Sequence, residues 1–413
     1  MNRVTKTAAV AASLLGVVLG AGACSGDGEA APAPEADDKG PLTVWVMGDS
    51  SENFDQLVAP FEDETGIAVN AEAIPWDGVN SKLTTAVASG DGPDVTQIGL
   101  SNLAAFQDAG ALLDMDDYVD DHPALADENF PDAVASSEIS DEGHYSVPWV
   151  SDTRILFYRK DLLDKAGVTP PASWEEFHAA AAALAETNEH GYYIPQWDQA
   201  LPIEFTWQAG GDPVGSEGNV TLDSDEFRKA ADFYLSFYRD ELVPTNADFD
   251  QVQGFISGAS PMVISGPYFG NAVAGAAPEL DGEWGVATLP AEVNGLSLFA
   301  GSNVGIWNNT EHVGAALELL EYLADPKTQL AWFELTGELP TTQDALSNPK
   351  LADDPHVAVY VEQLSEAKLL PLVPEWDQIA AEMLSSLNAI ALNGADQDQT
   401  LADLNQKVED LQQ

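Results

Sequence analysis

The stretch VPWVSDTRILFYRKDLLDKAGVTPPASWEEF, residues 147–177, holds the features that decide the fold. It opens with Trp149, Asp152 and Arg154, continues as an apolar strand pattern at 155–158, and then changes to helical spacing before a double proline. A flat ring and two charged groups beside the start of a strand are typical of a cleft for a polar small molecule, because stacking and charged hydrogen bonds have to converge on one spot. The stretch therefore predicts a binding cleft at a junction between elements.

Strands and helices alternate along the residues before this stretch. Apolar runs predict strands at 42–47, 67–74 and 94–98. Between them, apolar side chains recur at helical spacing in two segments that end at Gly66 and Gly90. This alternation predicts an α/β fold with a mostly parallel sheet that helices cover on both faces.

Polar and aromatic residues follow the first two predicted strands. Asp49 comes after the first strand, and Trp76 and Asp77 come after the second, behind a proline. In open α/β sheets, ligands bind beyond the carboxyl ends of the strands. We therefore expect Asp49, Trp76 and Asp77 to contact a ligand, with core packing as the alternative for Trp76.

Two capping boxes mark helices after the opening stretch. Ser173 is followed three residues later by Glu176, and Asp223 is followed at the same spacing by Glu226. In such a box the first side chain accepts a hydrogen bond from the backbone three residues on, and the acidic side chain reaches back. The sequence therefore predicts helices that begin at these two positions.

The N-terminus has the pattern of an export signal. Arg3 and Lys6 precede apolar and small residues at 8–22, a run that is too short to cross a bilayer as a mature helix. The run leads to Cys24, the only cysteine of the chain, in the context LGAGAC. This context resembles the lipobox of bacterial lipoproteins, although Ala stands where Leu is usual, and implies a lipoprotein signal peptide at 1–23 with lipidation of Cys24. The alternative is a secretory peptide with a chance cysteine.

Residues 24–40 are rich in Gly, Ala, Pro, Asp and Glu, which predicts a flexible tether. The chain as a whole has 15 basic and 69 acidic residues, a formal net charge of −54. Such a charge repels phosphate backbones, so nucleic acid is not an expected partner. A hypothesis for the excess is a saline habitat, where screening weakens self-repulsion; a melting temperature that does not rise between low and molar NaCl would contradict it.

Several segments carry a family resemblance. The run ILFYRKDLLDKAG at 155–167 resembles the signature of the extracellular solute-binding proteins of ABC importers, sugar-binding family 1, the maltose-binding-protein-like lipoproteins. Further segments agree in the same order: VASGDGPDV at 87–95, FISGASPMVISGPYFGN at 255–271, GSNVGIWNNTEHVGAALELLEYL at 301–323 and GELP at 337–340. Arg159 departs from the pattern, since Asn commonly precedes the Lys. The run WVSDTR is similar to the version in binders of glucosides and related disaccharides.

The resemblance implies the two-lobe periplasmic-binding-protein fold of class II type, in which the chain crosses a hinge three times and the lobes close on a ligand. We expect crossings near 151, 305 and 353. Lobe 1 then comprises 41–151 with 306–352, and lobe 2 comprises 152–305 with 353–413.

The resemblance also implies a function. It predicts a substrate-binding lipoprotein of an ABC sugar importer, which captures a disaccharide or oligosaccharide of glucoside type and delivers it to the permease. The expected location is the extracytoplasmic face of the cell membrane, with a lipid anchor, and the expected state is a monomer. The spacing of His and Cys fits no transition metal, and no nucleotide-binding loop is present in the sequence, so we expect no metal, no cofactor and no catalysis.

A sugar site needs charged groups for the hydroxyls and aromatic rings for the C–H faces. Asp152 and Arg154 are the predicted hydroxyl ligands, with Trp149 beside them; a structural ion pair between the two is the alternative. Family positions and exposed-looking aromatics complete the predicted set with Ser302, Asn303, Tyr268, Phe269 and Trp376, besides Asp49, Trp76 and Asp77. Weaker candidates are Trp197, Trp207 and Gln208, and the remaining tryptophans are assigned to the core.

Two other functions fit parts of the sequence. A polyamine or another non-sugar solute would suit an acidic cleft, although Arg154 argues against a cation. A GDSL-type esterase would use Ser50 in the run MGDS, with Asp353 and His356 near the C-terminus. The sequence lacks the Gly-x-Asn-Asp block that would supply oxyanion donors to such an enzyme, and a motif this short arises easily by chance.

Overall fold

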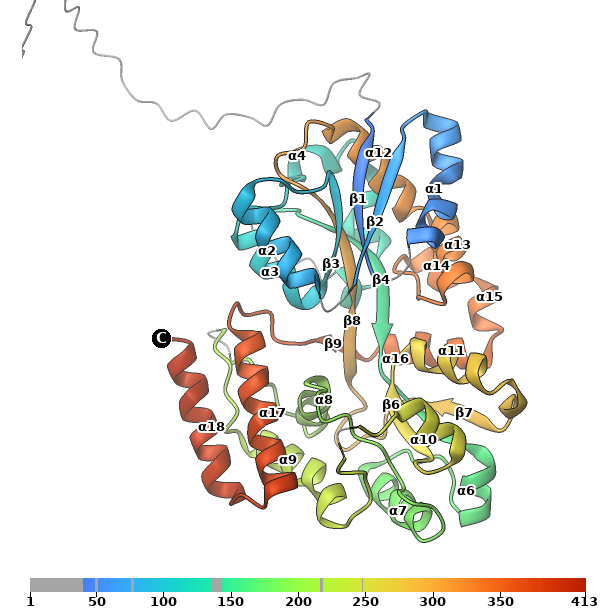
Figure 1. The fold of residues 1–413 in the computed structure, drawn as a ribbon, viewed down its shortest axis with the longest axis vertical. Helices are drawn as coiled ribbons and strands as arrows, with labels where there is room; N and C mark the ends of the chain where they lie inside the picture. Colours follow the sequence, from blue (N-terminus) through green and yellow to red (C-terminus); the bar gives the residue numbers. More distant parts are fainter. Residues whose placement is uncertain (1–39, 49–50, 76–77, 136–142, 216–217, 247) are drawn as a thin grey trace, which may run out of the picture. The chain divides into compact units, whose positions relative to one another are not determined.

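The computed structural model describes residues 40–48, 51–75, 78–135, 143–215, 218–246 and 248–413 (Figure 1). The predicted signal peptide, Cys24 and nearly all of the predicted tether lie outside these residues. So do four residues predicted to act in a site, Asp49, Ser50, Trp76 and Asp77. Among the described residues, no helix is both long enough and apolar enough to span a membrane.

A six-stranded sheet organises the first part of the fold. The strands run in the order β2-β1-β3-β8-β4, and β9 pairs with β8 at one end. Their bounds are β1 Leu42–Met47, β2 Val69–Ile74, β3 Val95–Gly99, β4 Val147–Thr153, β8 Ser297–Ile306 and β9 Ala367–Leu369. The pairs β1–β2, β1–β3 and β8–β9 are parallel, whereas β8 is antiparallel to both β3 and β4.

Helices cover this sheet on both faces, as the sequence predicts. Figure 1 shows α2 and α3 on one side of the sheet, with α1 and α13 on the other. The bounds are α1 Ser51–Thr65, α2 Val79–Ser89, α3 Leu100–Asp108, α12 Val313–Ala324 and α13 Pro326–Thr336. Helix α1 buries Phe54, Leu57, Val58 and Phe61, because these side chains recur on one face of a helix. Gly90 ends α2 in the left-handed conformation.

A three-stranded sheet organises the second part, in the order β6-β5-β7. Its strands are β5 Ile155–Arg159, β6 Met262–Ser265 and β7 Trp284–Ala287, and both pairs are antiparallel. The prediction of a mostly parallel sheet is therefore wrong for this sheet and incomplete for the first, where β8 runs against its neighbours. The reason is that apolar runs identify strands but not their direction, which depends on how the chain returns from the other sheet.

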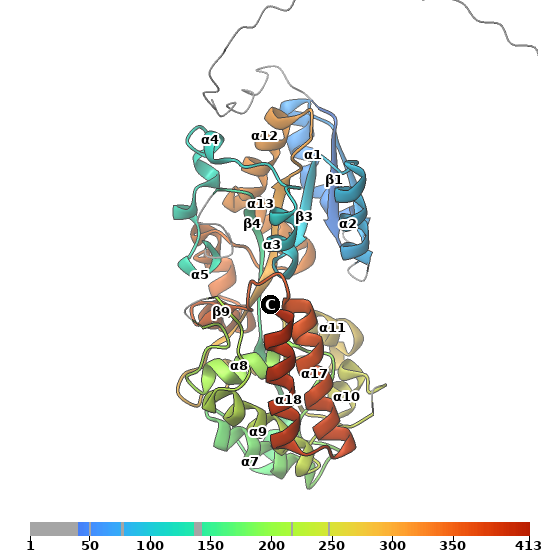
Figure 2. The same cartoon turned by 90° about the vertical axis from the view of Figure 1, so that its left-hand side faces the viewer.

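Helices pack on both faces of this smaller sheet. Leu156 and Ile264 belong to one apolar cluster, whereas Ile155 and Phe157 belong to the other. The helices are α6 Lys160–Ala166, α7 Trp174–Ala185, α8 Ala200–Gln208, α9 Asp225–Arg239, α10 Gln251–Ser257, α11 Pro267–Ala276, α16 Pro355–Leu364, α17 Trp376–Asn393 and α18 Gln397–Leu411. Figures 1 and 2 show α17 and α18 side by side.

Short helical turns complete the described elements. They are α4 Asp116–Val119, η2 Pro123–Leu125, η3 Asp127–Asn129, α5 Asp132–Ala135, η4 Pro278–Leu280, α14 Gln343–Leu346 and α15 Pro349–Ala352.

The helix caps test the two predicted capping boxes. Ser173 caps α7, since its Oγ accepts a hydrogen bond from the backbone of Glu176 at 3.2 Å. The second prediction is wrong by one residue, because Ser224 caps α9 and accepts from the backbone of Phe227 at 3.0 Å. A serine three residues before Phe227 has the ideal spacing for this bond. Asp223 instead forms an ion pair with a nearby arginine.

The chain changes from one sheet to the other at identifiable places. Arg154 lies between β4 of the larger sheet and β5 of the smaller one, close to the predicted first crossing. The return from β7 to β8 takes place between Ala287 and Ser297, ahead of the predicted crossing near 305. Strand β8 is longer than its apolar run suggests, because Gly301 and Ser302 continue it. The chain therefore returns to the larger sheet earlier than expected. The predicted lobe boundaries remain predictions.

Candidate functional site

Three cavities lie in a row and share lining residues. The largest, called here the large cavity, has a volume of about 700 Å³ and includes Asp152, Tyr268 and Glu338. It shares Ala300 and Gly301 with a middle cavity of about 260 Å³. The middle cavity in turn shares lining residues with an outer cavity of about 390 Å³. Along the row, the lining residues come from strands of the larger sheet, from helices that include α8 and α11, and from the segment before α17.

The large cavity is lined by groups that donate or accept hydrogen bonds. They come from α1, β3, β4, α11, β8 and the turn after α13. The polar side chains include three amides, two carboxylates and one phenol: Asn53, Gln97, Asn271, Asp152, Glu338 and Tyr268. Amides and carboxylates together can serve a ligand whose hydroxyls both donate and accept.

Asp152 and Arg154 form the charged pair beside these cavities. Arg154 Nη1 lies 3.8 Å from Asp152 Oδ2, and the two side chains keep 16% and 27% of their surface exposed, respectively. Asp152 Oδ1 and Arg154 Nε have no hydrogen-bond partner among the described residues. Burial raises the pKa of Asp152, an effect that Arg154 opposes. Burial lowers the pKa of Arg154, but the carboxylates around it, Asp152 first, outweigh burial and raise it overall.

Gly266 lets this pair approach the start of α11. A Cβ on Gly266 would lie 2.7 Å from Asp152 Oδ1 and 2.8 Å from Arg154 Nη1, which is closer than such contacts allow. The backbone at Gly266 has a φ of −89°, so a side chain is excluded by space and not by backbone conformation. The absence of a side chain therefore preserves the positions of Asp152 and Arg154.

Glu338 supplies the second carboxylate of the large cavity. Its Oε2 accepts a hydrogen bond from the indole nitrogen of Trp332 at 2.7 Å. Burial raises the pKa of Glu338, while the bond from Trp332 lowers it and the Asp152 carboxylate raises it. Gly337 has a φ of 79°, and a Cβ there would lie 2.3 Å from Asn271 Nδ2. The turn thus brings Glu338 and Asn271 to the same cavity, although the sequence prediction includes neither.

Ser302 and Asn303 were both predicted to contact the ligand, but the strand separates them. Ser302 lines the large cavity and its Oγ accepts from Gln97 Nε2 at 2.6 Å. Asn303 is 2% exposed and donates to Ser146 Oγ at 2.8 Å. Neighbouring residues of a strand point to opposite faces, so only Ser302 reaches the cavity. Asn303, among the described residues, does not line the large cavity.

The aromatic predictions divide in the same way. Tyr268 is 47% exposed and lines the large cavity, and Gln251 Nε2 donates to its hydroxyl at 2.9 Å. Phe269 is fully buried and packs on Phe157, with 4.9 Å between ring centroids. Trp149 is 1% exposed, and its ring lies 5.6 Å from that of Trp332. Phe269 and Trp149 therefore belong to the core, and it is their neighbours, Tyr268 and Val150, that line the large cavity.

The middle cavity contains Arg154, Trp197 and Asp198. Trp197, a weaker candidate from the sequence, is 63% exposed. Among the described residues, Trp197 and Tyr268 are the aromatic side chains with the largest exposure, and each lines one of these adjoining cavities. The sequence does not show which distant segments lie near Trp197. Its exposure could be inferred, because its neighbours Pro195, Gln196 and Asp198 are typical of a surface turn.

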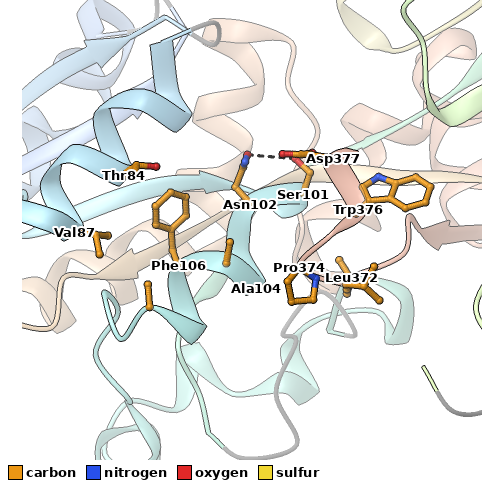
Figure 3. Close-up of a pocket in the computed structure, with 13 residues that line it drawn as sticks. Thr84, Val87, Ser101, Asn102, Ala104, Phe106, Leu372, Pro374, Trp376 and Asp377 are labelled. Carbon is orange, nitrogen blue, oxygen red and sulfur yellow. Dashed lines mark hydrogen bonds between the residues drawn. The ribbon is translucent and has the colours of Figure 1, made fainter. Parts of the chain in front are cut away.

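The outer cavity is mostly apolar. Figure 3 shows Val87 and Phe106 on one side of it, with Leu372, Pro374 and Trp376 on the other. Trp376 is 2% exposed at the start of α17, and its indole nitrogen has no partner among the described residues. Trp376 therefore lies at the far end of the row from Asp152. The other weaker candidates, Trp207 and Gln208, are buried in α8.

The described part of the chain shows neither a metal site nor an assembled esterase site. No group of three or more His, Cys, Asp or Glu side chains there could hold a metal ion. The His356 ring stacks on Trp284 with 4.2 Å between centroids, and burial lowers its pKa. Asp353 is exposed at the end of α15, and the carboxylate that bonds to the His356 backbone belongs to Asp354.

Residues 47–330 match the family model of the bacterial extracellular solute-binding proteins. The chain belongs to this family. Its fold is that of the two-lobe MalE-type binding proteins: it superposes on the sugar-binding protein MalE from Xanthomonas citri with a TM-score of 0.83 and 29% identity, covering 90% of this chain and 96% of that one. The family consists of extracellular binding proteins of ABC transporters, not of enzymes.

Two further relatives are known by their ligands. The galactooligosaccharide-binding protein of Bacillus subtilis is 25% identical over 403 residues, which cover 93% of this chain and 92% of the relative. The GacH receptor of Streptomyces glaucescens, solved without ligand and with acarbose, has a TM-score of 0.80 and 25% identity, with 90% of this chain and 97% of that one covered. The resemblance inferred from the sequence segments is thereby confirmed.

Proposed function

We propose that this chain is the substrate-binding subunit of an ABC importer for a neutral disaccharide or oligosaccharide of glucoside type. The observation that carries the proposal is the large cavity, in which amides, carboxylates and the exposed Tyr268 ring surround one volume. The relatives named above for oligosaccharides support the same class of ligand. The ligand leaves this site chemically unchanged.

The chemistry of the large cavity fits a polyhydroxyl compound. Each sugar hydroxyl can donate to a carboxylate while it accepts from an amide or a guanidinium, and the C–H faces can stack on Tyr268 and Trp197. A micromolar dissociation constant corresponds to about 8 kcal/mol. Several hydrogen bonds to charged groups, at about 1.5 to 3 kcal/mol each, supply this before the cost of closure is subtracted.

The proposed ligand contacts follow the cavities. Asp152, Arg154, Tyr268 and Ser302 are retained from the sequence prediction. Trp197, a weaker candidate from the sequence, joins them because it lines the middle cavity, and the structure adds Asn53, Asn271 and Glu338, which line the large cavity. Trp376 is a proposed contact only for a ligand long enough to extend into the outer cavity. Asp49, Trp76 and Asp77 stay proposed contacts from the sequence alone.

The membrane attachment is part of the proposal. Cleavage after residue 23 would make lipidated Cys24 the mature N-terminus, with residues 25–40 as the tether. A tethered monomer would capture its ligand at the extracytoplasmic face and deliver it to the permease. A Cys24→Ser variant that still enters the membrane fraction of the producing cell would contradict this attachment.

A polyamine is the second candidate ligand, because the carboxylates of Asp152, Asp198 and Glu338 line the large and middle cavities. Arg154 lies beside them and would repel a polycation. A neutral sugar is repelled neither by these carboxylates nor by Arg154, so the presence of both charges favours a sugar as the ligand.

A ligand screen tests the proposal. Thermal shift and tryptophan fluorescence would be measured for the mature protein with maltose, trehalose, sucrose, cellobiose and monosaccharides, and with spermidine as the cationic comparison. We expect a raised melting temperature with at least one disaccharide and none with spermidine. A response to spermidine alone would overturn the sugar assignment.

A further inference from the structure

Glu204 is a buried carboxylate that the site described above does not use. It lies in α8 and has no exposed surface. Its Oε1 accepts hydrogen bonds from the backbone N–H of Leu298 at 2.8 Å and from Ser297 Oγ at 3.1 Å. Its Oε2 has no hydrogen-bond partner among the described residues. An unpaired oxygen on a buried carboxylate is costly to keep, which calls for a role.

Ser297 connects Glu204 to the crossing at Arg154. Its Oγ lies 2.9 Å from the Arg154 carbonyl oxygen and 3.2 Å from the Arg154 backbone nitrogen, which donates to it. Thr153 Oγ1 lies 2.7 Å from the carbonyl oxygen of Leu298, the residue that donates to Glu204. The two segments where the chain changes sheet, at Arg154 and just before Ser297, are therefore fastened to each other and to α8.

The Ser297 hydroxyl has one proton but two acceptors within reach. They are Glu204 Oε1 and the Arg154 carbonyl oxygen. An ionised Glu204 attracts this proton more strongly, because charged acceptors form the stronger hydrogen bonds. A protonated Glu204 releases it to the Arg154 carbonyl. With Glu204 ionised, the Ser297 hydroxyl donates to the carboxylate while its oxygen accepts from the Arg154 backbone nitrogen, and the negative charge also attracts the Arg154 guanidinium.

The titratable groups that act on Glu204 come from three neighbouring segments. They are Arg154 at the crossing, Asp198 in the turn before α8 and Tyr192 after α7. Burial raises the pKa of Tyr234 in α9, and the nearby Asp198 and Tyr192 add to this rise. Burial raises the pKa of Glu204 to about 7, with Asp198 adding to the rise, while the Leu298 backbone and Arg154 lower it. The group therefore changes charge near neutral pH.

We propose that Glu204 is a positioning residue that holds Arg154 for the ligand while its carboxylate is ionised, so that protonation of Glu204 weakens binding. The inference rests on the proposed function and deepens it. Glu204 is buried and lines none of the three cavities, so it acts on the ligand through Ser297 and Arg154.

The sign of the pH dependence follows from this arrangement. A ligand that takes hold of Arg154 favours the ionised form of Glu204, and so lowers the pKa of Glu204 in the bound state. Binding then releases a proton, and affinity is complete above the pKa of the free protein and falls as the pH drops through it.

The test is a titration of wild type and Glu204→Gln with maltose, trehalose, sucrose and cellobiose at about pH 8 and about pH 5.5. For the sugar that binds, we expect wild-type affinity to fall about fivefold between these pH values, and Glu204→Gln to bind more weakly at the higher pH with a change below about twofold. The matched control is Glu62→Gln. Glu62 lies in α1, and its carboxylate also accepts a backbone hydrogen bond, from the nitrogen of Val69 at 2.7 Å. This variant should keep the wild-type profile.

A second variant covers the case in which Glu204→Gln does not fold. Ser297→Ala removes the hydroxyl that connects the carboxylate to Arg154, so the fall in affinity between the two pH values should shrink to below about twofold although Glu204 is kept. A wild-type pH profile in either variant would overturn the inference, as would a wild-type affinity equal at both pH values. Failure of wild type to bind any of these sugars at the higher pH would overturn the proposed function, and the inference with it.

Discussion

The guanidinium of Arg154 and the carboxylate of Asp152 lie 3.8 Å apart, close enough to attract but too far for a hydrogen bond. Each also has one atom without a hydrogen-bond partner among the described residues. A pair built only for stability would close this gap, because a bidentate contact is the stronger arrangement. This geometry fits the proposed role of the two residues as ligand contacts.

Removal of either charge tests this relationship. Asp152→Ala and Arg154→Ala should each weaken sugar binding by about tenfold or more, which is about 1.4 kcal/mol, because each removes a charged hydrogen bond to the ligand. Isothermal titration would measure the change. The control is Asp223→Ala, which breaks a surface ion pair with Arg228; neither residue lines any of the three cavities, so affinity should stay unchanged. Wild-type affinity in both site variants would move the binding site elsewhere.

Gly266→Ala tests whether Asp152 and Arg154 need the space that is left by the missing side chain at residue 266. The added methyl would lie within 2.7 Å of Asp152 Oδ1, so the side chains of Asp152 and Arg154 must shift. We expect binding to weaken by about 1 kcal/mol, with a smaller loss of stability because the backbone conformation suits alanine. Gly275→Ala is a suitable control, since nothing lies within 4 Å of its added methyl. Equal affinities for the two variants would show that the pair does not need its present position.

Trp197 offers a test of the stacking surface. Its ring is 63% exposed, so Trp197→Ala should change the free energy of unfolding by no more than about 0.5 kcal/mol. Sugar affinity should fall about fivefold, because the ring no longer covers a C–H face. Leu392→Ala, which truncates a side chain with 38% exposure on α17, should leave affinity unaltered. A Trp197→Ala variant that binds as wild type would remove the middle cavity from the proposed site.

Glu204 also has a predictable effect on stability. Its pKa of about 7 in the folded protein is above the ordinary value of 4.5, so the folded state holds more protons than the unfolded state between these values. The ionised carboxylate therefore costs stability, and this cost grows as the pH rises from about 4.5 to about 7. Glu204→Gln should gain stability relative to wild type over that interval, by up to about 3 kcal/mol.

Urea unfolding of wild type and Glu204→Gln at about pH 5 and about pH 8 measures this difference. The variant should combine higher stability at the higher pH with weaker sugar binding. A stability difference that is the same at both pH values would contradict the raised pKa.

The regular elements around β1 and α1 could be predicted from periodicity, because a buried strand and a one-sided helix impose patterns that few other structures share. The charged pair was also predictable, since Asp152 and Arg154 stand together just before an apolar strand pattern. Strand direction was not, because β5, β6 and β7 are assembled from distant segments whose apolar runs carry no orientation.

The candidate residues that the sequence did not indicate have a different explanation. Asn271 and Glu338, which line the large cavity, and Glu204, which lines none of the cavities, are single polar residues in separate helices and turns, and only the folded chain brings them near Asp152 and Arg154. The burial of Asn303 and Phe269 could have been anticipated. Each is next to a residue that lines the large cavity, and the alternation of a strand or the turn of a helix points the two neighbours in different directions.

The most direct test of the central claim is isothermal titration of the mature wild-type protein with maltose, trehalose, sucrose and cellobiose, and with spermidine in parallel. The account predicts saturable binding of at least one disaccharide, with a dissociation constant in the micromolar range or below, about 8 kcal/mol, and no heat from spermidine. Saturable binding of spermidine with no response to any sugar would contradict it.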